Sequence, residues 1–256
     1  GKCCVAGATE IVVNEEKKTV TVGGKVFHEG DVLSVNGSTG LVYEGEIKMV
    51  PADLGGDFGR LMGWADKYRR LKVRANCNTP EDAENARGFG AEGIGLCRTE
   101  RMFFAPDRIL NMRSMILSDT TEQREAALER IRPFMVGDFY EMYKANPDSM
   151  VNIRLLDPPL HEFLPEIGDK ANIKELAEKL GVTEEKVEGR INQLQQANPM
   201  MGFRGVRLCV AYPEIYAMLA RAIVQAAIKA KKELGHDIEP EIMIPLAGEL
   251  KEYAWA

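Results

Sequence analysis

The sequence predicts an α/β protein built in two parts. From Glu10 to Val50 it carries short β-rich runs separated by glycine-containing turns, which is the pattern of a small β unit. From residue 71 onward, strand-like and helical segments alternate, and this order predicts parallel strands joined by helical crossovers. We count about five strand-like segments there, whereas a closed (β/α)8 barrel has eight strands, so we expect a partial TIM barrel.

The β-rich first part occupies residues 1–50. Gly23-Gly24 and Asn36-Gly37 supply chain reversals between its strands. A unit of this size buries too little surface to be stable alone, so we expect it to be the C-terminal part of a larger domain. The strand-like runs are Glu10–Asn14, Thr19–Val22, Asp31–Val35 and Gly40–Tyr43.

A linker is expected over residues 51–70, between the two parts. Pro51 to Gly63 contains several glycines, and Trp64 to Arg70 has charged and aromatic residues at helical spacing. We therefore expect a connecting segment followed by a short linker helix.

The partial barrel is expected over residues 71–256. Its strand-like segments are Leu71–Ala75, Gly93–Cys97, Met150–Leu156, Gly205–Cys209 and Glu241–Pro245. Its helices are expected at Pro80–Phe89, Asp107–Met115, Thr121–Ala145 and Pro213–Leu234, and two of them begin with proline at the first helical position. A charged insertion from Ile173 to Gln195 should form two short helices separated by Gly181-Val-Thr183.

Composition argues against several classes of partner. The formal net charge of −6 gives no broad positive field, so nucleic-acid binding is not favoured. No apolar run reaches the roughly 18 residues that span a bilayer, and no signal-peptide pattern opens the chain. Five cysteines without a CxxC pair argue against a disulfide framework and favour a cytoplasmic protein.

Arginines lie where strands of the predicted barrel end. Arg98 ends one strand and Arg154 ends another, while Arg204 lies in a glycine-containing loop with Arg207 close behind it. The C-terminal ends of barrel strands face the active site. Because guanidinium groups hold carboxylate or phosphate with paired hydrogen bonds, these positions predict a site for a small, doubly anionic substrate.

The alternative is that these arginines only pair with nearby acids. Glu100 and Asp157 are the candidates for such pairing. One isolated arginine would favour that interpretation, but three arginines at strand ends favour a substrate site. The histidines form no nucleophilic triad, and the sequence has neither a His/Cys metal cluster nor a P-loop for ATP.

Five segments of the second part carry recognisable motifs: Leu71–Asn76, Gly90–Glu100, Arg154–Phe163, Asn198–Gly202 and Pro240–Pro245. Together they closely resemble the pyruvate phosphate dikinases, within the wider family of phosphoenolpyruvate (PEP)-using enzymes. The Gly-Ile-Gly-Leu-x-Arg-Thr-Glu strand is shared across that wider family, whereas the Leu-Asp-Pro-Pro-Leu-His-Glu-Phe loop is the part specific to the dikinases.

The resemblance implies an enzyme that interconverts ATP, phosphate and pyruvate with AMP, diphosphate and PEP. A phosphohistidine on a swivelling domain would carry the phosphoryl group, and residues 1–50 would be the C-terminal part of that domain. By motif position, Arg98 and Arg154 would bind the phosphate and carboxylate of the substrate, and Arg204 would stabilise the phosphoryl group. Arg207, Asp157 and Glu100 are further candidates.

The resemblance also implies what this chain lacks. The carrier histidine would precede Gly1, the ATP-binding domain would lie outside this chain, and the Mg²⁺ ligands and the acid/base cysteine would follow Ala256. We therefore expect no catalytic residue and no metal ligand in this chain, and little activity from it alone. The family further implies a homodimer. Two alternatives stay open: a PEP-dependent phosphocarrier of the enzyme I type, which the Pro158-Pro159 loop disfavours, and a non-catalytic barrel module for dimerisation.

Overall fold

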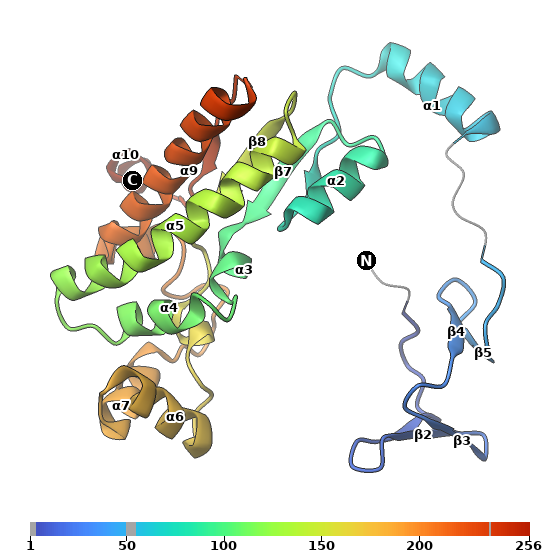
Figure 1. The fold of residues 1–256 in the computed structure, drawn as a ribbon, viewed down its shortest axis with the longest axis horizontal. Coiled ribbons are helices and arrows are strands. Elements are labelled where there is room, and N and C mark those ends of the chain that lie inside the picture. The colour runs from blue at the N-terminus through green and yellow to red at the C-terminus, as the bar shows by residue number, and fades with distance from the viewer. Residues whose placement is uncertain (1–3, 50–54, 236) are drawn as a thin grey trace. The chain divides into compact units, whose positions relative to one another are not determined.

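The computed structural model describes residues 4–49, 55–235 and 237–256 of the chain. The chain divides into two compact units, Gly1–Arg69 and Arg70–Ala256, called here the first and second units. Strands and helices carry the same labels in the text and in Figure 1.

Among its described residues, the first unit contains two small antiparallel sheets and one helix. Strands β1, β2 and β3 form one sheet, and β4 pairs with β5. The two-residue turn Gly23-Gly24 joins β2 to β3, and both glycines have positive φ, as such hairpins require. The bounds are β1 Val12–Asn14, β2 Thr19–Val22, β3 Lys25–His28, β4 Leu33–Asn36, β5 Leu41–Glu44 and α1 Gly56–Tyr68.

Two sequence predictions for the first unit need correction. Strand β3 was not expected, because its four residues, Lys25-Val-Phe-His28, do not alternate between polar and apolar side chains. The linker helix was expected from Trp64, whereas α1 begins at Gly56. Gly59 and Gly63 lie inside the helix, and such glycines weaken the helical signal of the segment before Trp64. Residues 51–54 of the predicted linker lie outside the described residues.

A four-stranded parallel sheet is the framework of the second unit. The strands follow one another in sequence order, β6-β7-β8-β9, and helical segments connect them. Figure 1 shows β7 and β8, the two longest strands of this sheet. The strand bounds are β6 Ala75–Asn76, β7 Gly93–Arg98, β8 Met150–Arg154 and β9 Glu241–Met243. The mixed α/β class with parallel strands is therefore confirmed.

Two long helices, α5 (Thr121–Ala145) and α9 (Pro213–Leu234), pack against each other along their length (Figure 1). Thr120 caps α5, since its hydroxyl accepts from the Gln123 N–H and the Gln123 side chain accepts from the Thr120 N–H. Their buried faces supply much of the core, including Phe139 and Leu219, which are fully buried. Both helices begin and end where the sequence predicted.

The shorter helices complete the second unit. The expected pair in the insertion is confirmed as α6 and α7, separated where Gly181 adopts a left-handed conformation and Thr183 caps α7. The bounds are α2 Pro80–Gly88, α3 Thr99–Phe103, α4 Ile109–Ile116, the 3-10 helix η1 Leu160–Phe163, α6 Lys170–Leu180, α7 Glu184–Leu194, α8 Val206–Ala211 and α10 Leu250–Trp255.

The strand expected at Gly205–Cys209 is wrong, because this segment forms helix α8. Gly205 has a φ of +59°, and a Cβ there would lie 2.8 Å from the carbonyl oxygen of Pro245. This left-handed residue turns the chain, and the apolar run after it continues as a helix rather than as a strand. The strand expected at Leu71–Ala75 is also shorter, since β6 covers only Ala75–Asn76.

No helix within the described ranges is both long enough and apolar enough to cross a membrane.

Candidate functional site

Two of the predicted arginines are neighbours at the C-terminal ends of adjacent strands. Arg98 is the last residue of β7 and Arg154 the last of β8, and the parallel register pairs one with the other. The backbone N–H of Arg98 donates to the side-chain oxygen of Asn78 at 3.2 Å. The strand ends therefore bring these two side chains to one edge of the sheet, as the sequence predicted.

Arg204 reaches the same edge from a loop rather than from a strand. Its Nη2 lies 2.6 Å from Asp157 Oδ2 and its Nε lies 3.2 Å from Oδ1, so the two side chains form a bidentate ion pair. The Gly205 N–H donates to the Asp157 carbonyl at 2.9 Å, so the backbone of Asp157 also holds this loop. The loop expected around Arg204 is present, but the prediction that all three arginines lie at strand ends is wrong for Arg204, which is followed by helix α8. Asp157 nevertheless holds Arg204 close to Arg154.

Asp157 links the two arginines. Its Oδ2 lies 2.8 Å from Arg154 Nη1 as well as 2.6 Å from Arg204 Nη2, and its side chain is almost fully buried. The hydrogen bonds that Arg204 donates to Asp157 raise the pKa of Arg204, which remains protonated. One buried carboxylate therefore holds two guanidinium groups together, and we call Arg98, Arg154, Arg204, Glu100 and Asp157 the arginine cluster.

Glu100 is the second acid of the arginine cluster. It lies at the start of α3, directly after the β7 strand end, and one of its oxygens pairs with Arg154 Nη2. Its other oxygen and the Nε of Arg154 are both buried, and neither has a hydrogen-bond partner among the described residues. Because unsatisfied buried polar atoms are rare, these two atoms indicate a place where a further polar group fits.

The ion pairs of the cluster bear on the alternative that the arginines only pair with local acids. Arg154 and Arg204 do pair with acids, but they share one, so the pairing gathers them instead of separating them. No carboxylate of the described residues lies within ion-pair distance of the Arg98 guanidinium. Besides Asp157 and Glu100, the charge of Glu162 also acts on Arg204, so the three guanidinium groups of the cluster face three nearby carboxylates.

Arg207 does not join the arginine cluster by any contact. Its Nη1 donates to the carbonyl oxygens of Met201 and Gly202 at 2.9 and 2.7 Å, so it ties down the loop that precedes Arg204.

Two positions of the site were missed in the sequence. Asn78 fixes the backbone of Arg98, and its place just beyond the end of the short strand β6 was the available signal. Pro245 accepts a hydrogen bond from the Val206 N–H at 2.9 Å and requires glycine at position 205. Neither contact follows from spacing alone, because each joins segments that are distant in sequence.

Known proteins resemble this chain over most of its length. Residues 53–256 match the family described as PEP-utilising enzyme, PEP-binding domain. The chain is 54% identical over 252 residues to the pyruvate, phosphate dikinase of Clostridium symbiosum, a match that covers 98% of the chain and 29% of that protein. It is 51% identical over 246 residues to the pyruvate, phosphate dikinase of Giardia intestinalis, covering 96% and 28%, respectively.

A plant protein gives a similar match. The chain is 51% identical over 253 residues to pyruvate, phosphate dikinase 2 of Zea mays, covering 98% of the chain and 28% of that protein. The chain thus spans less than a third of the length of these curated relatives. Because the family match extends over most of the chain and includes the whole arginine cluster, the chain belongs to the PEP-utilising enzymes and carries their PEP-binding domain.

Proposed function

We propose that this chain is a segment of a pyruvate phosphate dikinase, and that the arginine cluster binds PEP and pyruvate. The observation that carries the proposal is the bridge through Asp157, which holds Arg154 and Arg204 together next to Arg98. PEP carries a phosphate and a carboxylate close together. Neighbouring guanidinium groups match such a substrate, because each can hold one anionic group with paired hydrogen bonds.

In this proposal the acids of the cluster position the arginines before the substrate arrives. Glu100 and Asp157 engage both terminal nitrogens of Arg154, so its side chain is held in one orientation. The guanidinium of Arg98, at the end of the neighbouring strand, would donate to substrate oxygens. Prior orientation of donors toward developing negative charge supplies much of the catalysis in phosphoryl transfer.

The activity of the whole protein follows from the named relatives and is part of the proposal. The enzyme would interconvert ATP, phosphate and pyruvate with AMP, diphosphate and PEP through a phosphohistidine, as a cytoplasmic homodimer. Residues 1–50 would belong to the swivelling phosphohistidine domain, 51–70 to the linker, and 71–256 to a TIM barrel. ATP and phosphate would bind outside this chain.

A Mg²⁺ requirement is proposed for the whole enzyme only. Among the residues that the structure describes, no three His, Cys, Asp or Glu side chains gather closely enough to hold a metal ion. These residues do not fit a metal site, so we assign no step to the ion here.

The test is a titration of PEP into a full-length protein that contains this chain and into its Arg98→Ala and Arg154→Lys variants. Lysine keeps the charge of Arg154 but not its paired donors. We expect each variant to bind PEP at least about tenfold more weakly, the scale of one lost charge-assisted hydrogen bond. Arg87→Ala is the matched control, since Arg87 pairs with the exposed Asp148 away from the cluster. Unchanged PEP affinity in both test variants, with native circular dichroism, would overturn the proposal.

A further inference from the structure

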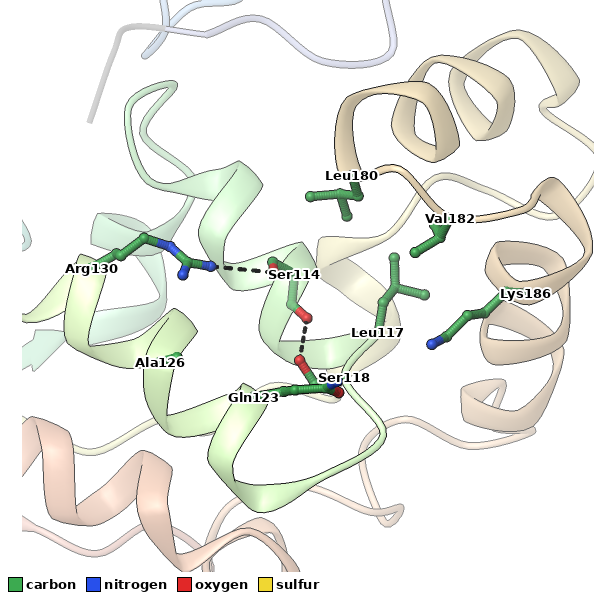
Figure 2. A pocket seen from close by; sticks show the side chains of 9 residues that line it. All are labelled: Ser114, Leu117, Ser118, Gln123, Ala126, Arg130, Leu180, Val182 and Lys186. Atoms are coloured by element: carbon green, nitrogen blue, oxygen red, sulfur yellow. Dashed lines mark hydrogen bonds between the residues drawn. The ribbon is translucent and has the colours of Figure 1, made fainter.

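A second candidate site lies among four helices of the second unit, and it shares no residue with the arginine cluster. Helices α4 and α5 form one side of a cavity of about 290 Å³, and the α6–α7 pair forms the other (Figure 2). This volume lies just below the range of roughly 300–1,000 Å³ that is usual for drug-sized ligands. The cavity therefore suits a small molecule rather than a nucleotide.

The cavity has two cationic side chains and an apolar wall. Figure 2 shows Arg130 of α5 and Lys186 of α7 extending toward the cavity from opposite sides, and Leu117 between them. Leu180 and Val182, at the turn between α6 and α7, continue the apolar wall. No carboxylate lines the cavity. Charge and shape together therefore favour a ligand with a negative group and a short hydrocarbon portion.

Arg130 is held ready for an anion by neutral partners. Its Nε donates to the side-chain oxygen of Asn111 at 2.7 Å, and its Nη2 to the hydroxyl of Ser114 at 3.4 Å. Within residues 4–49, 55–235 and 237–256, no acid lies within ion-pair distance of its guanidinium. The other arginines of the two long helices differ, since Arg132 and Arg221 pair with Glu129 and Arg124 pairs with Glu214. The positive charge of Arg130 is therefore oriented but uncompensated.

Lys186 is also fixed in place. Its backbone N–H donates to the capping hydroxyl of Thr183 at 3.2 Å, and its Nζ lies 2.6 Å from Asp119 Oδ2. Because Asp119 neutralises it in part, Lys186 contributes less net charge to the cavity than Arg130. We assign the main anion contact to Arg130 and a supporting role to Lys186.

We propose that this cavity binds a small aliphatic carboxylate, with the carboxylate at Arg130 and the hydrocarbon portion against Leu117, Leu180 and Val182. The inference does not rest on the dikinase activity, because none of these residues belongs to the arginine cluster. Such a ligand would join α4 and α5 to the α6–α7 pair and stabilise the folded chain through binding linkage.

The test uses pentanoate as the probe, titrated into the 256-residue chain and followed by backbone amide chemical shifts. We expect saturable binding with a dissociation constant of about 1 mM, as for other ligands of this size. The largest shifts should fall in α4, the first half of α5 and the α6–α7 turn. Acetate, which lacks the tail, and pentanamide, which lacks the charge, should each bind at least about tenfold more weakly if both features contribute.

Two variants decide which residues are responsible. Arg130→Gln should weaken pentanoate binding about tenfold, whereas Arg132→Gln, two residues away on α5 and outside the cavity, should leave it unchanged. Lys186→Gln should weaken binding by a smaller factor, with Lys179→Gln as its control. The proposal is overturned if pentanoate gives no saturable shifts, if acetate binds as well, or if Arg130→Gln and Arg132→Gln behave alike.

Discussion

Both units carry apolar residues on their strands, but they bury them very differently. In the first unit no described residue is buried, and Val12 and Leu41, both on strands, are 64% and 51% exposed. In the second unit the strands and long helices share one core, where Ile153 and Phe139 are fully buried. Strand formation alone therefore says little about burial.

The difference shows which interactions define each unit. The hairpins of the first unit are fixed by local turns and cross-strand hydrogen bonds, which are individually weak. The second unit depends on apolar contacts between residues that are far apart in sequence, such as those joining α5 to α9. Substitutions should therefore have large, cooperative effects in the second unit and small, local ones in the first.

Core truncation should produce the largest contrast. Phe139→Ala removes a fully buried ring from α5, and we expect it to lower the free energy of unfolding by about 3–5 kcal/mol. Val12→Ala changes an exposed strand residue, and we expect a change below about 0.5 kcal/mol. Urea unfolding followed by helical circular dichroism measures both. Equal losses in the two variants would contradict the contrast between the units.

The pH dependence of stability gives a second contrast, and it compares one cysteine from each unit. Burial, with smaller contributions from Cys77 and Glu100, raises the pKa of Cys97 from 9.0 to about 12, whereas Cys4 is exposed. The folded chain therefore holds the Cys97 proton more tightly than the unfolded chain does. The resulting stabilisation is complete below pH 9 and is lost as the pH rises from 9 toward 12.

The measurement is the free energy of unfolding between pH 9.5 and 10.5. Cys97 should contribute a fall of about 1.4 kcal/mol per pH unit, the value for one proton. Other buried groups titrate in every variant, so the relevant quantity is the difference between wild type and Cys97→Ala, whose slope should be shallower. Cys4→Ala should keep the slope of the wild type. A shallower slope in both variants would contradict the effect of burial.

Much of the second unit could be predicted because its signals are local. The long helices α5 and α9 are bounded by Thr120 and by Pro213, and capping chemistry of this kind is readable in sequence. Helix α8 was mistaken for a strand because its start depends on Gly205 lying against Pro245, some 40 residues later in the chain. Local periodicity carries no information about such a contact.

At the site, too, some features have local signals in the sequence and others depend on contacts between distant residues. Strand ends could be read from the apolar runs before Arg98 and Arg154, and the parallel register then makes these residues neighbours. The part played by Asp157 could not be read, because one carboxylate accepting from two arginines depends on a loop from a different part of the chain. The residue types at a site can thus be predicted from the sequence more readily than the contacts that orient those residues.

The smallest effect should come from the hairpin turn of the first unit. Gly24 has a φ of +77°, and a Cβ added there would meet nothing within 4 Å, so Gly24→Ala tests backbone conformation without a steric clash. Alanine in this left-handed region costs about 1 kcal/mol, and asparagine costs less. We expect amide hydrogen exchange in β2 and β3 to accelerate about fivefold in Gly24→Ala and less in Gly24→Asn, since 1.4 kcal/mol corresponds to a factor of ten.

The same exchange experiment reports on both units at once. Amides in α5 and α9 should exchange at the wild-type rate in Gly24→Ala, because the turn acts only on the strands that it joins. Faster exchange in the long helices would mean that the hairpin and the core unfold together. The local character of the first unit would then be wrong, and its exposed strands would have to contribute to the stability of the whole chain.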